Sequence, residues 1–257
     1  MRNIHGRLIG GIVLCAGQSR RFGADKREAR LPGGETLLER AVSLMAQCID
    51  EVALVIGATD NERSYAQRFP RAIILRAPRS AGGMGFALAD AVRQLPRWDG
   101  ALVALADKPF IAPASLQAVL DLLGEHDLVV PTYQLAWGHP VGFARQHFLA
   151  LARLEGDIGA RVLIEQERAC CRFIEIDDPG IVADIDTPAE LDFWVQRLAV
   201  RRPAPDLGPV RDLAASRWQN HRSRRLAAGS LSCISGNTVW RMDCARVALW
   251  NAGFGRA

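Results

Sequence analysis

A loop near the N-terminus has the residue types that bind phosphate groups. The segment Leu14–Lys26 follows an apolar run and reads LCAGQSRRFGADK. Gly17 has no Cβ, so backbone N–H groups there can approach phosphate oxygens closely. The guanidinium of Arg21 and the ammonium of Lys26 can neutralise those oxygens. The spacing differs from GxxxxGKS/T and from GxGxxG. The alternative is an ordinary turn between a strand and a helix, with arginines on its surface.

Carboxylates at two later places could bind a magnesium ion. Asp107 follows the apolar run Gly100–Ala106, which predicts that it lies at the carboxyl end of a buried strand. Asp184 and Asp186 flank one apolar residue just before a predicted helix. Mg²⁺ prefers one or two carboxylates together with phosphate oxygens, so Asp107 and one of the later acids could share an ion. The alternatives are a helix or turn cap for Asp107, and a helix N-cap formed by Asp186 or Thr187.

Two further features could contact a second ligand. His139, in the segment GHPVGF, could donate a hydrogen bond to a bound substrate, and a structural role in a turn is the alternative. Asp157 is predicted to cap the helix that follows it. Only two of the 32 cationic residues are lysines, Lys26 and Lys108. Lysine retained among so many arginines suggests a compact charge on phosphate, with chance as the alternative.

The elements that must position these residues alternate between strands and helices. The predicted strands are 8–14, 51–56, 72–75, 100–106, 127–130, 141–144 and 172–176, and the predicted helices are 36–48, 61–69, 83–95, 113–123, 146–154, 158–168 and 188–200. Thr36 and Glu39 form a capping box at the first helix. The pattern predicts an α/β domain with a mainly parallel sheet, and we expect strand 141–144 at its far side. Ligands bind at the carboxyl ends of such strands, so 15–26 and 107–109 should share one edge.

The net charge of +4 comes from the C-terminal segment. Residues 201–257 hold ten Arg and three Asp, a net +7, whereas the first 200 residues hold 22 cations and 25 anions, a net −3. This division argues against nucleic-acid binding by the whole protein. Prolines and weak apolar periodicity predict that 201–257 is a poorly ordered appendage outside a domain formed by 1–200.

Composition limits the class of protein further. The chain has 257 residues, 49% of them apolar, which suits a globular protein with a sizeable core. No segment is apolar over the roughly 18 residues that a membrane helix needs, and the N-terminus lacks a signal-peptide pattern. The six cysteines have no zinc-site spacing and fit a reducing cytoplasm. We therefore expect a cytoplasmic protein with no membrane partner.

Six motifs together resemble the MobA-like nucleotidyltransferases, and especially the molybdenum cofactor cytidylyltransferases. They are LCAGQSRRFGADK, RSAGGMGFALADAV, LADKPFI, GHPVGF, GDIGARVLI and DIDTPAEL, in that order, over about residues 8–198. The resemblance implies a Rossmann-like three-layer fold with a mainly parallel mixed sheet. It also implies Mg²⁺-dependent transfer of a nucleoside monophosphate from an NTP to a phosphorylated acceptor, with release of pyrophosphate.

The resemblance implies roles for individual residues. The nucleotide would be bound by Leu14, Cys15, Ala16, Gly17, Ser19, Gly23 and Lys26. The catalytic residues would be Lys26, Arg21 and Asp107. The metal ligands would be Asp107 with Asp186 or Asp184. The acceptor would be contacted by Gly138, His139, Pro140 and Lys108.

The base and the acceptor are inferred from finer details. Ala16 matches the LAAG of the cytidylyl branch, whereas Cys15 matches neither branch, so we favour CTP, with molybdopterin as the acceptor. Lys108 stands where the family often has Met or Gln, and Ala87 stands where it has Ser. An added cation at 108 would suit a strongly anionic acceptor. The alternatives are a sugar phosphate or other phosphorylated alcohol as acceptor, or a non-catalytic chaperone that delivers cofactor to a molybdenum hydroxylase.

Overall fold

The computed structural model describes residues 3–4, 6–17, 22–200, 211–212, 231–235 and 238–242. Contacts between Cα atoms group the chain into two compact units, Met1–Ala214 and Ala215–Ala257. The boundary after residue 200 stays a prediction from composition. In the second unit, strands β11 (Leu231–Ser235) and β12 (Thr238–Met242) pair antiparallel. The prediction that residues 201–257 are poorly ordered stays a prediction, because most of these residues lie outside the described ranges.

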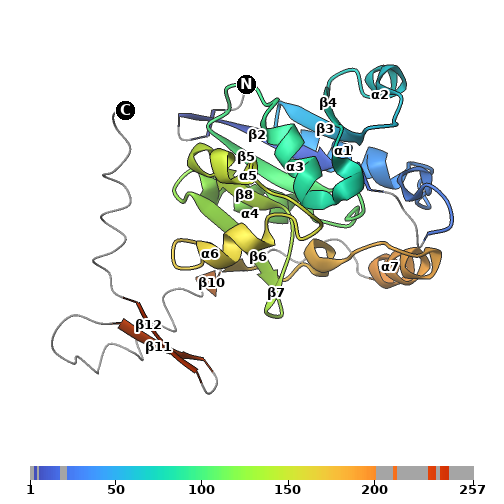
Figure 1. The fold of residues 1–257 in the computed structure, drawn as a ribbon. Coiled ribbons are helices and arrows are strands. Elements are labelled where there is room, and N and C mark those ends of the chain that lie inside the picture. Colours follow the sequence, from blue (N-terminus) through green and yellow to red (C-terminus); the bar gives the residue numbers. More distant parts are fainter. Residues whose placement is uncertain are drawn as a thin grey trace, which may run out of the picture. The chain divides into compact units, whose positions relative to one another are not determined.

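A ten-stranded mixed sheet forms the centre of the first unit (Figure 1). Its strands are β1 (Asn3–Ile4), β2 (Arg7–Leu14), β3 (Val52–Gly57), β4 (Ile73–Ala77), β5 (Gly100–Leu105), β6 (Leu128–Tyr133), β7 (Ala136–Trp137), β8 (Val141–Ala144), β9 (Arg172–Glu175) and β10 (Arg211–Asp212). The path is β10-β9-β6-β8-β5-β2-β3-β4, with β1 paired to β2 and β7 to β6. The pairs β2–β3, β2–β5, β3–β4 and β6–β9 are parallel, which confirms the predicted α/β class.

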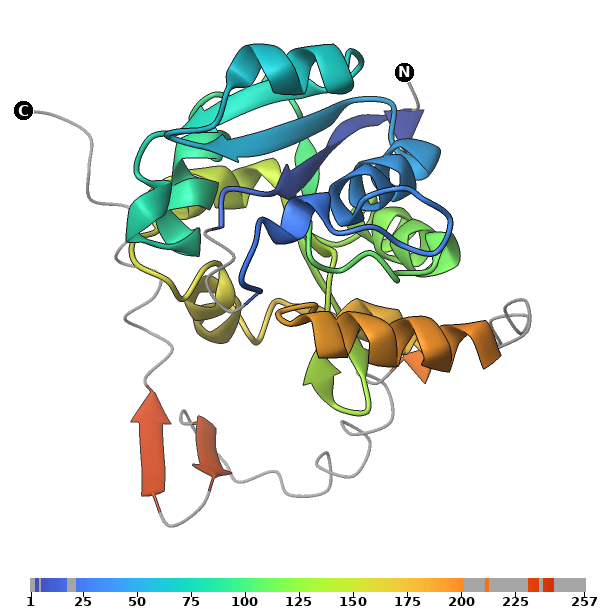
Figure 2. The ribbon, with the colours of Figure 1, turned by 90° about the vertical axis from the view of Figure 1, so that its right-hand side faces the viewer.

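Helices cover both faces of this sheet (Figure 2). They are α1 (Leu37–Cys48), α2 (Glu62–Arg68), α3 (Met84–Val92), α4 (Pro113–Leu123), α5 (Phe148–Leu151), α6 (Arg161–Gln166) and α7 (Pro188–Val200). Side chains alternate along a strand, so β2 supplies both cores. Val13 packs in the cluster with α1 and α4, whereas Ile12 and Leu14 pack in the cluster with α3, α5 and α6. The result is the three-layer arrangement that the resemblance implies.

The position predicted for strand 141–144 is wrong. β8 lies inside the sheet, antiparallel to both β5 and β6, and not at the far side. All four of its residues are buried, which an edge strand cannot achieve on its open side. Gly142 also fits this crowded place, because a Cβ there would lie 3.3 Å from side-chain atoms of Leu102 and Leu123.

Two glycines in β2 allow close packing at the centre of the sheet. A Cβ on Gly10 would lie 2.2 Å from the Trp98 ring, and a Cβ on Gly11 would lie 2.4 Å from the Met45 side chain. Trp98 is fully buried, and its indole N–H donates to Glu51 Oε2 at 2.6 Å. Gly10 therefore lets the Trp98 ring, and Gly11 the Met45 side chain, pack directly against the backbone of β2.

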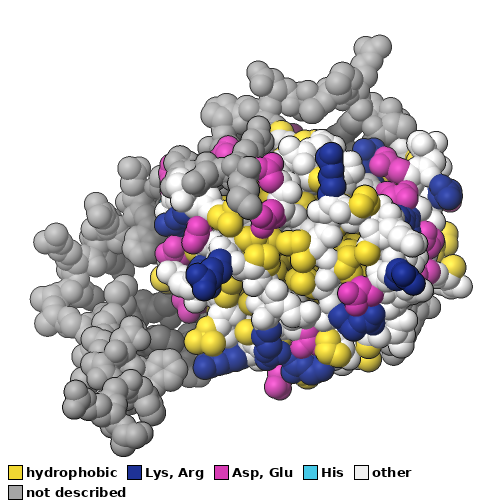
Figure 3. Space-filling view, turned by 90° about the horizontal axis from the view of Figure 1, so that it is seen from above, with side chains coloured by type: hydrophobic (Ala, Val, Ile, Leu, Met, Phe, Trp, Pro, Cys, Tyr) yellow, Lys and Arg dark blue, Asp and Glu magenta, His cyan; other side chains and the backbone are white. Residues whose placement is uncertain are grey.

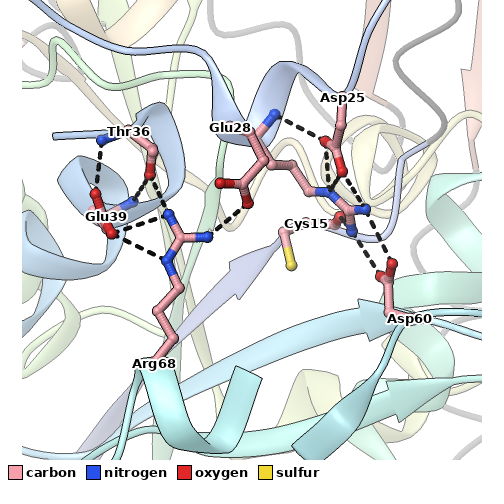
Figure 4. Close-up of polar contacts among 8 residues, drawn as sticks. Cys15, Asp25, Glu28, Thr36, Glu39, Asp60 and Arg68 are labelled. Atoms are coloured by element: carbon pink, nitrogen blue, oxygen red, sulfur yellow. Dashed lines mark hydrogen bonds and ion pairs between the residues drawn. The ribbon is translucent and has the colours of Figure 1, made fainter. Parts of the chain in front are cut away.

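The predicted capping box at α1 is confirmed (Figure 4). The Glu39 N–H donates to Thr36 Oγ1 at 3.2 Å, and the Thr36 N–H donates to Glu39 Oε2 at 2.8 Å. The Thr36 N–H lowers the pKa of Glu39 by stabilising its carboxylate. Arg68 on α2 joins this cap and reaches Glu28 Oε1 at 2.6 Å. One guanidinium thus ties α2, the start of α1 and the segment after Lys26 together.

The visible face in Figure 3 carries no broad field of one charge. Hydrophobic side chains gather in its middle, and basic and acidic side chains are mixed around them. This mixture agrees with the small net charge of the first 200 residues. Within the described part of the chain, no helix is both long enough and apolar enough to cross a membrane.

Candidate active site

A cavity of about 660 Å³ lies at the carboxyl ends of β2 and β5. The Ala106 N–H donates to the Leu14 carbonyl at 3.0 Å, so the loops after the two strands start side by side. This confirms that the loop after β2, which is predicted to bind phosphate, and the Asp107 segment share one edge. The lining residues are Leu14, Cys15, Ala16, Gly17, Lys26, Arg27, Ser80, Ala81, Gly82, Gly83, Met84, Ala87, Leu105, Ala106, Asp107, Asp157, Asp184 and Asp186.

Lys26 bridges two of the predicted metal-binding carboxylates. Its Nζ lies 2.7 Å from Asp107 Oδ2 and 3.0 Å from Asp186 Oδ1. The side chains of Lys26, Asp107 and Asp186 are only 17%, 20% and 31% exposed. Burial alone would lower the pKa of Lys26, but the two carboxylates outweigh it and raise the pKa. The fold thus brings Lys26 into contact with Asp107, which lies 81 positions later in the sequence, and with Asp186, which lies 160 positions later.

The donor set at this point fits a divalent cation. Asp107 Oδ1 is buried and accepts no hydrogen bond from the described residues. A buried carboxylate oxygen needs a partner, and a cation placed there would supply one. The described residues contain no cluster of three or more acidic, histidine or cysteine side chains suited to a metal. A two-carboxylate site suits Mg²⁺ when phosphate oxygens complete its shell.

The structure separates the two acids of the DIDTP motif. Asp184 Oδ1 lies 2.6 Å from the Nζ of Lys108, whereas Asp186 faces Lys26. Ile185 between them is fully buried against the start of α1. Both acids line the first cavity, on either side of this buried residue in the sequence. Asp186 is therefore the acid that lies with Asp107.

Thr187, and not Asp186, caps α7. Thr187 Oγ1 accepts the Glu190 N–H at 3.2 Å, and Glu190 Oε2 accepts the Thr187 N–H at 2.9 Å. The Asp186 N–H donates to the same Glu190 oxygen at 2.9 Å. Because this reciprocal box satisfies the helix start, the Asp186 carboxylate stays turned to Lys26. Helix capping therefore does not explain Asp186.

Arg27 is a site residue that the sequence reasoning missed. Its guanidinium donates to the Cys15 carbonyl at 3.1 Å and to Asp60 Oδ2 at 2.6 Å, and its Nη2 donates to Asp25 Oδ2 at 2.7 Å. Figure 4 shows Cys15, Asp25 and Asp60 around this point. Asp60 Oδ2 also accepts the Gly57 N–H at the end of β3. The network fixes the first turn of the phosphate-binding loop, and no local pattern around Arg27 indicates a partner 33 residues away.

The Cys15 side chain is buried in the core and is not available as a nucleophile. Its Sγ donates to the Val55 carbonyl at 3.0 Å, and burial raises the pKa of the thiol to about 12. A thiol with so high a pKa is a poor nucleophile. Cys15 thus contributes its backbone to the cavity and its side chain to the core.

The start of α3 lines the cavity because a glycine turn supports it. Gly83 has a φ of +123°, and a Cβ there would lie 2.5 Å from the Gly156 carbonyl oxygen. The Gly85 N–H donates to that same carbonyl at 2.8 Å. Asp157 Oδ1 accepts the Met84 N–H at 3.2 Å. The prediction that Asp157 caps the following helix is therefore wrong, since it caps α3, which is distant in sequence.

A second cavity of about 210 Å³ adjoins the first and is almost entirely apolar. The two cavities share Leu14, Met84 and Leu105 in their walls. Gly138 and His139 line the second cavity, whereas Pro140 is buried and lines neither. The side chains around it come from α3, β5, β6, β8 and the segment up to α6.

His139 presents a neutral ring to the second cavity. Its Nδ1 lies 3.3 Å from the Val103 carbonyl, which can only accept, so Nδ1 carries the proton. Burial, followed by the Lys108 ammonium, lowers the pKa of His139 to about 4. The remaining ring nitrogen, Nε2, is then an acceptor. His139 therefore offers an acceptor to a ligand, whereas the sequence suggested a donor.

The other predicted residues are placed as follows. Gly17 lines the first cavity, and a Cβ there would meet no atom within 4 Å. Gly23 has a φ of +76° and is exposed, outside the cavity lining. Ser19 and Arg21 lie outside the described residues. Lys108 is buried on Asp184, with 5% of its side chain exposed, and lines neither cavity.

The sequence profile of the MobA-like NTP transferase domain matches residues 11–170, more than half of the chain. The chain belongs to the MobA-like NTP transferase family. This transferase is an enzyme of the nucleotidyltransferase class, as its motifs predict. The match includes the phosphate-binding loop, Asp107 and the GHP segment.

Curated relatives of the transferase match more than half of its length. Purine catabolism protein PucB of Bacillus subtilis is 30% identical over 195 residues, which are 71% of this chain and 93% of that protein. A probable molybdenum cofactor guanylyltransferase of Chloroflexus aggregans is 33% identical over 135 residues, which are 52% of this chain and 61% of that protein.

A solved relative supports the fold of the transferase. The crystal structure of Rv0371c from Mycobacterium tuberculosis matches with a TM-score of 0.62 at 28% identity, over 73% of this chain and 98% of that chain. Rv0371c has also been solved in complex with manganese.

Proposed function

We propose that the transferase moves a nucleoside monophosphate, CMP from CTP, onto the phosphate of a molybdopterin-type acceptor and releases pyrophosphate. The observation that carries this proposal is the single charged point at which Lys26, Asp107 and Asp186 meet, inside a cavity large enough for a nucleotide. Phosphoryl transfer needs positioning and charge neutralisation more than covalent help from the protein. The site supplies both.

The phosphate-binding loop would hold the triphosphate. Its backbone at Cys15, Ala16 and Gly17 lines the cavity, and Lys26 stands at the cavity's acidic edge. Arg27 keeps this turn in place through the Cys15 carbonyl. We assign Arg21 and Ser19 to the phosphates on the motif alone. In this arrangement Lys26 moves from its carboxylates to a phosphate oxygen when the nucleotide binds.

Asp107 and Asp186 would hold a divalent cation, for which we propose Mg²⁺. The manganese complex of Rv0371c supports a metal in a relative of this fold. When bound, the metal neutralises negative charge on the phosphate oxygens. Asp184 is the weaker candidate ligand, because it pairs with Lys108, whereas Asp186 meets Asp107 at Lys26.

The second cavity would take the ring portion of the acceptor. Its walls are apolar except at His139 and Arg161. A sugar would leave several hydroxyl groups without partners against such walls, at a cost for each group. A largely planar ring suits them better, with Nε2 of His139 accepting from a ring N–H. The acceptor phosphate would then lie toward Asp107.

The base preference rests on the first turn. Ala16 matches the cytidylyl form of the motif, but the relative from Chloroflexus is named a guanylyltransferase. Both bases therefore belong in the test. We also propose that the product is passed to a molybdenum hydroxylase in the cytoplasm. The name of PucB, which places that relative in purine catabolism, is compatible with such a recipient.

The test is an assay of pyrophosphate release by the purified full-length chain with Mg²⁺. CTP, GTP, ATP and UTP would each be offered with molybdopterin and with a panel of sugar phosphates. We expect CTP with molybdopterin to give the highest kcat/KM. A higher value for GTP would overturn the base assignment, and a higher value for a sugar phosphate would overturn the acceptor.

The same assay separates the enzyme from a delivery chaperone. Stable co-purification with a molybdenum hydroxylase and no pyrophosphate release with any pair of substrates would contradict catalysis by this chain.

A further inference from the structure

Lys108 is an unusual residue beside the proposed metal site. It follows Asp107 directly, and its side chain is 5% exposed, whereas its partner Asp184 is 57% exposed. A buried ammonium is costly unless a carboxylate lies close by. The 2.6 Å contact with Asp184 Oδ1 supplies that carboxylate. The Lys108 ammonium is therefore paired with Asp184, which lines the first cavity, whereas Lys108 itself lines neither cavity.

Three links join the segment of Lys108 to the segment of Asp186. The first is the ion pair between Lys108 and Asp184. The second is a hydrogen bond of 3.1 Å from the Ile185 N–H to the Asp107 carbonyl. The third is Lys26, which contacts Asp107 and Asp186 together. When a nucleotide draws Lys26 away, the ion pair and the backbone hydrogen bond remain, and the ion pair is the one of these two that involves side chains.

Contacts on both sides of Asp186 anchor the backbone of its segment. Ile185 is buried in the cluster that includes Leu31 and Leu37 and anchors the middle of the segment. The cap at Thr187 fixes the backbone after Asp186 but does not touch its carboxylate. The backbone before Ile185 is held at Asp184 by Lys108. The direction of the Asp186 side chain is thus set from both sides.

We propose that Lys108 is a positioning residue whose ion pair with Asp184 holds segment 184–186 so that Asp186 faces Asp107. In this role Lys108 does not contact the acceptor. The role in turnover rests on the proposed function, whereas the role in arranging the two carboxylates does not. Substitution of Lys108 or Asp184 should therefore weaken metal binding by Asp107 and Asp186, although both of these carboxylates are retained.

The test uses full-length Lys108→Met, Asp184→Asn and the double variant, with Asp192→Asn as a matched control at an exposed acid of α7. Asp184→Asn leaves the buried ammonium without its partner, so its Tm should fall by roughly 3–6 °C. The double variant should regain most of this loss, because it contains no unpaired buried charge. Asp192→Asn should leave Tm unchanged.

The decisive readout is binding of Mn²⁺ alone, followed by electron paramagnetic resonance well below every Tm. Mutation of residues that orient metal ligands typically weakens binding by about 10–100-fold. We expect both single variants and the double variant to weaken Mn²⁺ binding at least about tenfold. If the double variant regains wild-type Mn²⁺ affinity together with its Tm, the pair is only structural and the proposal is overturned.

Kinetics separate this role from an acceptor contact. Positioning predicts a lower kcat in all three variants, with the KM for the acceptor unchanged. A raised acceptor KM in Lys108→Met, with Asp184→Asn like wild type, would overturn the proposal in favour of direct contact. If the wild-type chain releases no pyrophosphate, the proposed function fails, but the Mn²⁺ result still decides the positioning role.

Discussion

The two adjoining cavities of the transferase differ sharply in charge. The larger one has four aspartates, Lys26 and Arg27 in its walls, whereas the smaller one has no acidic residue and is lined mostly by apolar side chains. They nevertheless share Leu14 and Leu105, the last residues of β2 and β5. The same strand ends thus form part of the wall of a charged cavity and of an apolar cavity. The charged residues come mainly from the loops after the strands, whereas much of the apolar surface comes from the strands themselves.

The largest effect should come from the charged cavity. Asp107→Asn removes the carboxylate that both Lys26 and the proposed metal need, so we expect kcat to fall by about a thousandfold or more. Pyrophosphate release would measure it, and the KM for the acceptor should change little. Asp192→Asn is the control for an exposed acid. Activity retained in Asp107→Asn would contradict the metal assignment.

A charge placed at the mouth of the apolar cavity should act on the acceptor alone. Ile158 lines this cavity and is 64% exposed, so Ile158→Asp should fold normally. We expect the acceptor KM to rise about tenfold, because a carboxylate there repels a phosphorylated ligand. Leu149→Asp is the matched control, since Leu149 is 65% exposed and lines neither cavity. If the two substitutions change the acceptor KM equally, the second cavity is not the site of the acceptor.

Acid should destabilise the protein partly through His139. The pKa of His139 is lowered from 6.5 to about 4 in the folded protein, so the unfolded chain binds this proton more tightly. Stability is full above about pH 6.5 and is lost as the pH falls toward 4. The loss from this one group approaches roughly 3 kcal/mol.

Urea unfolding of wild type and His139→Gln at pH 7.5 and pH 5 would measure this loss. The variant should lose less stability between the two values. If both proteins lose the same amount, His139 is not held neutral by its surroundings.

The smallest effect should follow removal of residues 201–257. No residue after Asp186 lines either cavity within the described part of the chain. We expect the shortened protein to keep kcat and both KM values within about twofold, because it retains every described residue that lines the two cavities and because salt screens the charge of exposed residues. Steady-state kinetics at physiological ionic strength would show it. Loss of folding would instead mean that the basic segment belongs to the domain.

Much of the fold follows from local patterns. Apolar runs and helix caps predict the order of strands and helices, and the capping box of Thr36 and Glu39 forms as predicted. The place of β8 could not be predicted in this way, because four apolar residues fit an edge or an inner position equally well. Pairing with β5 and β6 depends on contacts between segments far apart in sequence.

The site was predictable to a similar degree. The motifs indicate Lys26, Asp107 and the two later acids as charged residues at strand and helix ends. They do not indicate which acid meets which lysine. The role of Arg27 could not be predicted, because its partner Asp60 lies beyond α1 and β3 in the sequence. The prediction for Asp157 was wrong because sequence patterns indicate caps only for the next helix, whereas Asp157 accepts from Met84, 73 positions earlier.

Local patterns in the sequence were enough to predict the order of the strands and helices, because turn glycines, caps and apolar periodicity act over a few neighbours. The family was predicted from the resemblance of six motifs. Only the tertiary structure decided that Asp186 pairs with Lys26 while Asp184 pairs with Lys108. That choice depends on which side chains the folded segments bring within about 3 Å, where an ion pair forms, and on how deeply each is buried. The two Lys–Asp contacts therefore differ in place and burial in a way that no local pattern distinguishes.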